Sequence, residues 1–209
     1  MSIYFATPCY RSNPQQSAQW AANKARELNL KGAKVSLQIE SPLLPIARTR
    51  IISDFYNEKF CTHIFMRDDD INIRAETLQK MISADVPAIL VPYKLRKKDR
   101  FDVVFDESGN LLWGGLGCAL VRREVIDTLW KKYFEELHFY EDDGSLRVHL
   151  FRDIYATINN DNMRRLMKED HSFWYRVRES GFSLNVIEGE EIIHSTAVSK
   201  YPNILEVKE

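Results

Sequence analysis

Glycine is scarce in this chain, and the first of its eight glycines is Gly32. Two common phosphate-binding motifs, the P-loop and the dinucleotide-binding GxGxxG turn, place glycines directly after a strand. The first predicted strand covers residues 3–6, so the sequence excludes both motifs at its end. A nucleotide bound there would need its phosphate charge to be met by a metal ion or by basic side chains.

A surplus of positive charge is also missing, with 29 Lys and Arg residues against 30 Asp and Glu residues. This balance gives no general attraction to nucleic acids or to anionic membranes, so we expect no nucleic-acid partner. No apolar stretch is long enough to span a bilayer, and no basic segment leads a long apolar one at the start. The three cysteines, far apart in the sequence, indicate neither a zinc site nor a disulfide framework. We expect a soluble protein in a cytoplasmic compartment and leave open a longer parent protein.

The pattern of apolar residues predicts an α/β fold in a single domain over residues 1–209. In the first half, strands at 3–6, 35–39, 62–66 and 88–91 alternate with helices at 14–30, 46–60 and 75–83. Such alternation predicts a mainly parallel sheet with helices on both faces. In the second half we expect a hairpin at 101–113, an apolar run at 118–121, helices at 123–133 and from 169 to Gly181, and strands at 184–187 and 191–194. Residues 135–165 are polar and weakly periodic, so we expect loops and short helices there.

Three consecutive aspartates, Asp68, Asp69 and Asp70, follow the apolar run at 64–66. In an extended backbone, Asp68 and Asp70 would point to one side and Asp69 to the other. Carboxylates held this close repel one another, and a hard divalent cation such as Mg²⁺ or Mn²⁺ would relieve that repulsion. The structural alternative is a solvated loop in which Asp70 caps the helix that begins near Arg74.

Other candidate residues fall at the carboxyl ends of the predicted strands, where ligands collect in such sheets. Segments 7–11, 68–70 and 93–98 should therefore share one edge. Basic side chains that could meet a diphosphate are Arg11, Arg48, Arg50, Lys94, Arg96, Lys97 and Lys98, although a solvated surface run explains the last two better than a binding role. Tyr10 is a candidate contact for a nucleobase.

Two further features could take part in the chemistry. Glu169 and Asp170 open a predicted helix, where a carboxylate can cap the helix or act as a general base. His194 ends the last apolar strand and could be a metal ligand or a structural histidine. Glycines 114, 115 and 117 could let the backbone approach a ligand closely, and the neighbouring Trp113 could pack in the core or stack on a sugar.

The order of these features resembles the nucleotide-sugar glycosyltransferases of the GT-A fold. The matching segments are 6–11, 47–50, 63–70 with its DxD motif, 114–123, 169–173 and His194. The likeness spans nearly the whole chain, and it implies a nucleotide-binding half at about 1–100 and an acceptor and catalytic half at about 101–209. The compact length looks most like the small virus-encoded glycosyltransferases of chlorella viruses, which would place the protein in a host cytoplasm.

The resemblance implies a role for each candidate. Asp70 and His194, with Asp68, would hold Mn²⁺ or Mg²⁺, and Asp170 would be the base of an inverting transfer, with Glu169 as the substitute. Trp113, Gly114, Gly115 and Gly117 would shape the donor and acceptor site. The donor would be a UDP-sugar, and the acceptor a hydroxyl of a glycan or glycoprotein, with a viral capsid glycan among the candidates. The nucleotide would contact Thr7, Pro8, Tyr10, Arg11, Arg48, Arg50, Asp68 and Asp69.

The sequence leaves other functions open. A carbohydrate-binding or scaffold module of the same fold would share these features without turnover, and a metal-dependent sugar-phosphate enzyme would also use paired aspartates. A phosphatase of the haloacid dehalogenase type is disfavoured, because Asn72 occupies the place of its Thr or Val. A sugar nucleotidyltransferase would need a glycine-rich loop after the first strand. Arg67, where the family usually has an apolar residue, and Ser195-Thr196 after His194 depart from the glycosyltransferase pattern.

Overall fold

The computed structural model describes residues 1–9, 13–39, 43–95, 100–157, 164–194 and 197–200. Its centre is a six-stranded sheet in the order β13-β5-β8-β3-β1-β2. These strands are β1 (Ile3–Cys9), β2 (Lys34–Ile39), β3 (His63–Arg67), β5 (Ala88–Leu90), β8 (Cys118–Arg122) and β13 (Asn185–Val186). All neighbouring pairs are parallel except those of β8, which runs antiparallel to both β3 and β5. The predicted α/β class with a mixed, mainly parallel sheet is confirmed.

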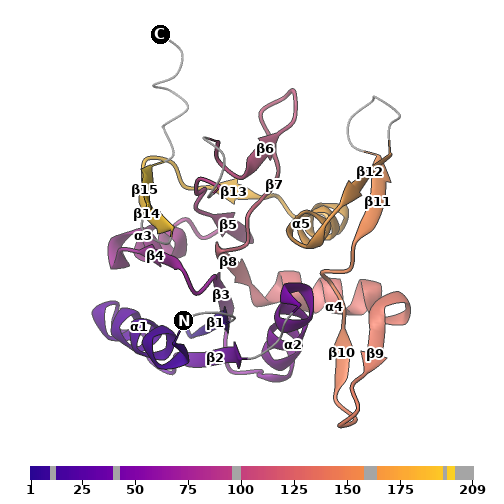
Figure 1. The fold of residues 1–209 in the computed structure, drawn as a ribbon, viewed down its shortest axis with the longest axis horizontal. Coiled ribbons are helices and arrows are strands. Elements are labelled where there is room, and N and C mark those ends of the chain that lie inside the picture. Colours follow the sequence, from indigo (N-terminus) through magenta and orange to yellow (C-terminus); the bar gives the residue numbers. More distant parts are fainter. Residues whose placement is uncertain (10–12, 40–42, 96–99, 158–163, 195–196, 201–209) are drawn as a thin grey trace.

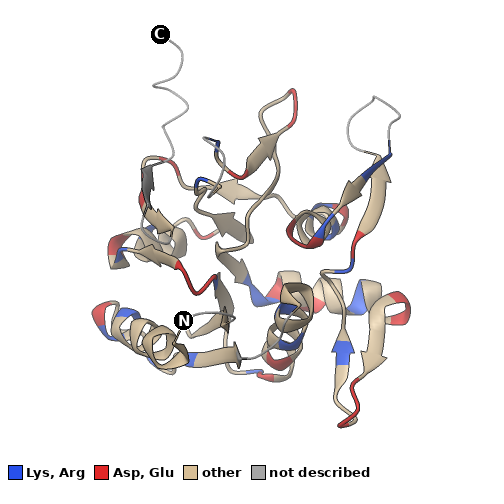
Figure 2. Cartoon of the chain, viewed as in Figure 1, with Lys and Arg blue, Asp and Glu red and all other residues tan. Residues whose placement is uncertain are grey.

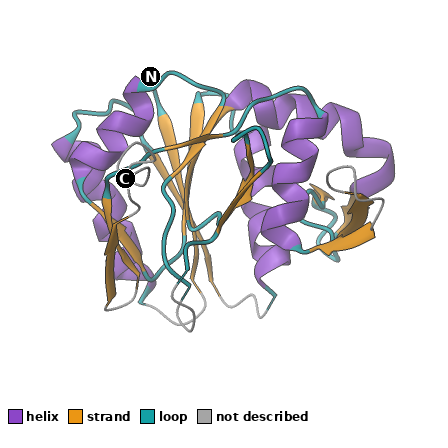
Figure 3. Cartoon of the chain, turned by 90° about the horizontal axis from the view of Figure 1, so that it is seen from above, coloured by secondary structure: helices purple, strands orange, loops and turns teal. Residues whose placement is uncertain are grey.

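Helices cover both faces of this sheet, which lies between two helical layers in Figures 1 and 3. One layer holds α1 (Pro14–Glu27) and α3 (Ala75–Ser83), and the other holds α2 (Leu44–Asn57), α4 (Arg123–Leu137) and α5 (Glu169–Glu179). Alternation along β1 explains the two cores, because Ile3 and Phe5 pack with the first layer, whereas Tyr4 and Ala6 pack with the second. Among the described residues, no helix combines the length and apolar character needed to cross a membrane.

The ends of the helices follow from local sequence. Asn13 caps α1 by accepting a hydrogen bond from the backbone N–H of Gln15, and Pro14 occupies the first helical position. The predicted extension of this helix to residue 30 was wrong, since α1 ends at Glu27. Gly181, with φ of +86°, follows α5 in the left-handed conformation that stops helices, as predicted.

Strand β1 continues further than predicted. Thr7, Pro8 and Cys9 belong to the strand and lie opposite Leu37, Gln38 and Ile39 of β2. On the other side of β1, pairing with β3 stops at Ala6. Pro8 therefore lies where only one neighbour is paired, and its missing N–H is tolerated there.

Small antiparallel units surround the main sheet. Strand β4 (Ile71–Ile73), which was not predicted, pairs with β14 (Glu191–His194), and β14 also pairs with β15 (Ala197–Lys200). The predicted hairpin at 101–113 is confirmed as β6 (Val103–Phe105) and β7 (Leu111–Gly114). The expectation of loops and short helices over 135–165 was wrong. The described part of that region holds the end of α4 and the hairpins formed by β9 (His138–Tyr140) with β10 (Leu146–Val148) and by β11 (Ile154–Thr157) with β12 (Arg164–Met167).

The topology places the predicted functional segments together. The carboxyl ends of β1, β3 and β5 lie at the same edge of the sheet as the amino end of the antiparallel β8. The aspartate segment after β3, Tyr93 after β5 and Gly117 before β8 therefore meet at this edge. Strand β8 lies between β3 and β5, so both halves of the chain build the same sheet.

Candidate functional site

A buried arginine organises the site. Arg48 on α2 is only 3% exposed and contacts three carboxylates. Its Nη2 donates to Asp68 Oδ1 at 2.8 Å, and its Nη1 lies 3.2 Å from Glu169 Oε1 and donates to Asp170 Oδ1. Burial opposes the charge of Arg48, yet the carboxylates of Asp170, Asp68 and Glu169 together raise its pKa above the ordinary value. One cation thus holds three acidic groups from two distant parts of the chain.

The acidic groups come from different elements. Asp68 directly follows β3, whereas Glu169 and Asp170 form the first turn of α5, where the backbone N–H groups and the helix dipole favour negative charge. Figure 2 shows acidic residues both in the segment between β3 and β4 and at the start of α5. Asp170 also accepts a hydrogen bond at Oδ2 from the backbone N–H of Leu116, at 3.0 Å. The glycine-containing segment 114–117 thereby touches the cluster directly.

The glycines of this segment are required by close packing. A Cβ at Gly117 would lie 2.7 Å from Asp68 Oδ2 and 2.8 Å from the hydroxyl of Tyr93, and one at Gly115 would overlap that same hydroxyl. The carbonyl of Gly117 accepts from the N–H of Asp68 at 3.1 Å, and its N–H donates to the hydroxyl of Tyr93 at 3.3 Å. The carbonyl of Gly114 accepts from Trp174 Nε1 at 2.8 Å. Because Gly115 and Gly117 have no side chains, the backbone of this segment packs directly against Asp68 and Tyr93.

Trp113, a predicted donor or acceptor contact, is buried and lies beside His171, with ring centroids 5.3 Å apart. Tyr93, the first residue of the predicted edge segment 93–98 but one to which the sequence gave no role, lies inside the cluster. Burial raises the pKa of Tyr93, and the neighbouring Asp68 and Asp170 raise it further. Its position at the end of β5 was the signal that could have identified it.

The predicted metal ligands Asp70 and His194 are close together. His194 Nε2 lies 3.5 Å from Asp70 Oδ2, and His194 Nδ1 is 2.8 Å from the carbonyl oxygen of Lys94. The carbonyl fixes the ring so that Nε2 faces the carboxylate, as second-shell contacts do in metal sites. Asp68 instead contacts Arg48. Among the described residues, no group of three or more His, Cys, Asp or Glu side chains is placed to hold a metal ion.

The aspartates lie in a turn rather than in the extended backbone that we expected. The N–H of Ile71 donates to the carbonyl of Asp68 at 3.0 Å, and the three residues connect β3 to β4. Asp69 occupies the same turn. The alternative that Asp70 caps the next helix was wrong, because Arg74 is the cap residue of α3 and no side chain caps that helix end.

Arg67 stabilises this turn from inside the protein. Its Nη1 donates to the carbonyl of Ile71 at 2.6 Å, its Nη2 donates to Ser17 Oγ at 2.9 Å, and its guanidinium lies 4.4 Å from the centre of the Trp20 ring. Trp20 in turn donates to Asn72 Oδ1 at 2.7 Å. From the sequence, Arg67 was only a departure from a pattern, because its partners come from α1 and β4.

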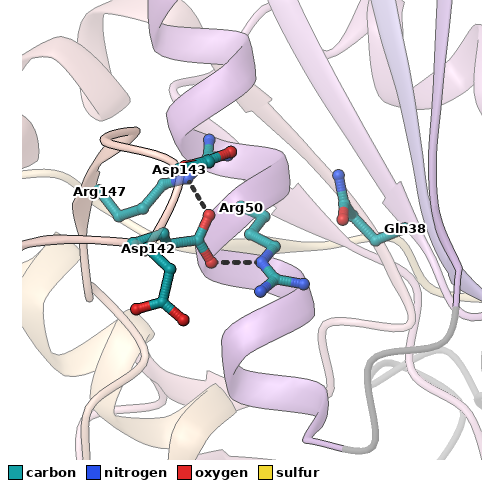
Figure 4. Close-up of a pocket in the computed structure, with 6 residues that line it drawn as sticks. Gln38, Arg50, Asp142, Asp143 and Arg147 are labelled. Carbon is teal, nitrogen blue, oxygen red and sulfur yellow. Dashed lines mark hydrogen bonds and ion pairs between the residues drawn. The ribbon is translucent and has the colours of Figure 1, made fainter.

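The remaining nucleotide candidates are more dispersed. Thr7 and Pro8 are buried in β1. Arg50 lies on another side of α2 from Arg48, where its Nε donates to Glu141 Oε1 at 2.5 Å. Figure 4 shows Arg50 and Arg147 directed toward one carboxylate, beside a cavity of about 590 Å³. Two predicted nucleotide contacts, Tyr10 and Arg11, and three basic candidates for a diphosphate, Arg96, Lys97 and Lys98, lie outside the described residues.

Proton affinities in the cluster are shifted. Burial raises the pKa of Glu169 to about 7; the charges of Asp170 and Asp68 add to this rise, and Arg48 opposes it. Burial also raises the pKa of Asp170, against the opposing effect of Arg48. A carboxyl group that titrates near neutral pH can accept or release a proton under ordinary conditions. The cluster therefore has the properties of an acid–base centre.

No protein-family model matches this sequence, and no curated protein matches it. Similar solved structures exist. A197 from STIV has a TM-score of 0.56 and 11% identity, with 97% of this chain and 95% of that chain covered. A glycosyltransferase involved in the glycosylation of the major capsid of PBCV-1 has a TM-score of 0.39 and 9% identity, over 65% of this chain and 68% of that chain.

A third similar structure is 4-diphosphocytidyl-2C-methyl-D-erythritolsynthase from Anaerococcus prevotii, with a TM-score of 0.49 and 9% identity, over 98% of this chain and 94% of that chain. At such identities a likeness shows the fold alone. The match to A197 shows that this arrangement of strands and helices occurs in a solved structure over nearly its whole length. The two lower scores carry no argument about the chemistry of this site.

Proposed function

We propose that this chain is a metal-dependent glycosyltransferase, which moves a sugar from a nucleoside-diphosphate donor to a hydroxyl of a glycan or glycoprotein. The proposed donor is a UDP-sugar. One observation carries the proposal: two of the three predicted metal ligands, Asp70 and His194, lie at the same sheet edge as the two predicted base carboxylates, Glu169 and Asp170. Residues more than 100 positions apart form this arrangement. A solvated acidic loop would not require it.

The residues at Asp70 and His194 fit a cation such as Mn²⁺ or Mg²⁺. They supply one carboxylate and one oriented imidazole, and such ions commonly complete their coordination with water and substrate phosphate. When bound, the ion would supply positive charge that stabilises the leaving diphosphate. The absence of a third protein ligand among the described residues is compatible with a site completed by the donor itself.

The second part of the proposal concerns the proton. As the acceptor oxygen bonds to the anomeric carbon and the bond from that carbon to the diphosphate breaks, a carboxylate must take the hydroxyl proton. Asp170 is the proposed base, and Glu169 is the substitute. Both line a cavity that opens beside the cluster, so an acceptor hydroxyl could reach either. Arg48 would keep Asp170 ionised by opposing its raised pKa.

Calorimetric titration of UDP into the protein, first with Mn²⁺ and then with EDTA, tests the nucleotide part of the proposal. GDP serves as the control for base preference. UDP binding that requires Mn²⁺ would support a glycosyltransferase and justify a turnover assay with UDP-sugars. If neither nucleotide binds under either condition, a carbohydrate-binding or scaffold module becomes the better explanation, and the aspartates form a solvated turn.

A further inference from the structure

A cavity of about 420 Å³ opens on the outer side of the acidic cluster. Volumes of a few hundred Å³ are typical of small-molecule sites. Its lining mixes hydrogen-bond donors and acceptors with an apolar ring, and consists of Pro45, Asp153, Lys168, Glu169, Asp170 and His171. His171 packs against the buried Trp113, which limits the orientations of its ring. Such a lining suits a ligand with several hydroxyl groups better than a fully apolar or singly charged one.

Hairpin β11–β12 rises directly from this cavity. Asp153 immediately precedes β11, and Lys168 immediately follows β12 with extended backbone (φ −81°, ψ 172°). Both residues line the cavity, so the two ends of the hairpin form part of its wall. Figure 1 shows the hairpin beside α5, the helix that carries Glu169 and Asp170. Whatever lies along the hairpin is therefore continuous with the proposed catalytic cavity.

One face of the hairpin exposes an aromatic platform. Ala156 and Met167 on the opposite face are buried, so that face of the hairpin packs against the core. Tyr155 and Leu166 lie opposite each other on the outer face and are 64% and 44% exposed. The guanidinium of Arg164 lies 5.7 Å from the centre of the Tyr155 ring. Side chains two residues apart in a strand point to the same face, so Asp153 shares a face with Tyr155, and Lys168 shares a face with Leu166. The platform and the cavity wall therefore lie on the same side of the hairpin.

We propose that the cavity and this platform bind the acceptor, and that the acceptor is a neutral oligosaccharide with one sugar in the cavity and the next on Tyr155. The inference rests on the proposed function and deepens it. A pyranose ring presents hydroxyls at its rim and C–H groups on its face, and a tyrosine offers both an apolar ring and a polar tip. The cavity meets the hydroxyls of the first sugar, and Tyr155 with Leu166 covers the apolar face of the second.

The size and charge of the platform favour a glycan over a protein partner. Two exposed apolar side chains and one arginine cover far less than the roughly 800 Å² per partner of a stable protein interface. The charges around it have both signs, since Asp153 and Glu169 line the cavity together with Lys168, and Arg164 lies over Tyr155. Neither a strongly acidic nor a strongly basic partner is therefore matched.

Saturation-transfer NMR with lactose, cellobiose and maltose tests this inference, because it needs neither nucleotide nor turnover. We expect at least one disaccharide to bind, to bind about tenfold more weakly after Tyr155→Ala, and to keep most of its affinity after Tyr155→Phe. Tyr140→Ala is the matched control, since Tyr140 is an exposed tyrosine (67%) on the other hairpin, on β9. That substitution should leave binding unchanged.

The outcomes separate this inference from the proposed function. UDP binding with no disaccharide binding would overturn the acceptor site and leave the transferase proposal standing. Disaccharide binding that depends on Tyr155, without any UDP binding, would support the sugar site and replace the transferase with a carbohydrate-binding module. Binding that is equally strong after Tyr155→Ala would overturn the platform. A dimer of the wild-type protein that Tyr155→Ala dissociates would show that a second copy of the chain covers it.

Discussion

Arg48 and Asp170 form a buried ion pair between residues 122 positions apart in the sequence. The pair joins α2 to the first turn of α5, and Asp68 after β3 shares the same guanidinium. Desolvated ion pairs are seldom a net source of stability, because removing both charges from water costs about as much as their attraction returns. The arrangement is therefore better explained by function: Arg48 fixes the positions of the carboxylates and opposes the rise in the pKa values of Glu169 and Asp170.

Removing the cation should expose this cost. Arg48→Met would leave three carboxylates close together without their shared cation, and we expect a loss of about 3–5 kcal/mol in the free energy of unfolding at neutral pH. Urea denaturation followed by circular dichroism measures it. Arg50→Met, on the same helix but partly exposed, is the control and should cost about 1 kcal/mol or less. Equal losses for the two variants would contradict a special role for Arg48.

The metal and base assignments make opposite predictions for nucleotide binding. Asp70→Asn removes the ionised ligand beside His194, so Mn²⁺-dependent UDP binding should fall by about tenfold to a hundredfold. Asp170→Asn should retain that binding and lose transfer, by about a hundredfold or more, because a general base contributes that much to the rate. Calorimetry and a UDP-release assay on the same preparations separate the two effects.

Full transfer activity in Asp170→Asn would make the base assignment wrong, and Glu169→Gln would then be the variant to test. A second control is Asp106→Asn, at the turn between β6 and β7, where the carboxylate accepts hydrogen bonds from Ser108 and Asn110 of its own loop. Neither UDP binding nor transfer should change in that variant.

The sequence predicted the main sheet well because the apolar runs there are unambiguous. The strand at 62–66, its acidic end and the helix at 75–83 were all placed within a residue or two. The four short strands between residues 138 and 167 were missed, since strands of three or four residues with few buried side chains carry almost no periodic signal. Their position depends on contacts with α2, α4 and α5 rather than on local pattern.

Long-range pairing explains what the sequence could and could not say about the site. The edge shared by the ends of β1, β3 and β5 followed from their parallel direction, so the proximity of Asp68 and Tyr93 was predictable. The position of Gly117 was not, because it depends on β8 running antiparallel to β3 and β5. The partners of Arg48 could not be predicted. The sequence offers several basic side chains for the three carboxylates, and only packing determines which basic side chain is buried beside them. The same holds for Arg67, whose partners lie on α1 and β4.

Arg67 provides a test of whether the aspartate turn must be held in place. Arg67→Met fills similar space and removes the donor to the Ile71 carbonyl, so UDP binding with Mn²⁺ should weaken by about tenfold, as expected when a second-shell partner is lost. Arg123→Met is the matched control, because Arg123 also donates to backbone carbonyls and lies over a ring, that of Phe55, but far from the turn. It should lower the free energy of unfolding without changing nucleotide affinity.

A parallel loss of nucleotide affinity in Arg67→Met and Arg123→Met would indicate general destabilisation and contradict a positioning role. Measuring UDP affinity at 10 °C and 25 °C separates the two, because a partly unfolded fraction would change with temperature whereas a displaced ligand would not. We expect the Arg67→Met defect to persist at both temperatures.

The raised pKa of Glu169 makes stability depend on pH in a definite direction. The unfolded chain releases this proton near the ordinary value of 4.5, whereas burial and the neighbouring carboxylates make the folded protein keep it until about pH 7. The folded state thus binds more protons between these values, and Glu169 contributes stability below pH 4.5 that is lost as the pH rises through 7. Glu169→Gln should remove this dependence, a change on the order of 2 kcal/mol between pH 4.5 and 7.5.

Glu141→Gln is the control of opposite sign. Burial alone would raise the pKa of Glu141, but hydrogen bonds from Arg50 and Arg147 lower it overall, so its contribution is present above the ordinary value and is lost as the pH falls. Urea denaturation of both variants and the wild type should therefore be extended below pH 4.5. The Glu169→Gln difference should change between pH 4.5 and 7, and the Glu141→Gln difference should change with the opposite slope only below 4.5. If Glu169, the substitute base, takes the hydroxyl proton, the rate of the proposed transfer should rise with pH through about 7 in the wild type. A rate that stays flat through this range, together with a Glu169→Gln curve parallel to wild type, would show that this carboxyl group neither holds the proton nor gates the reaction.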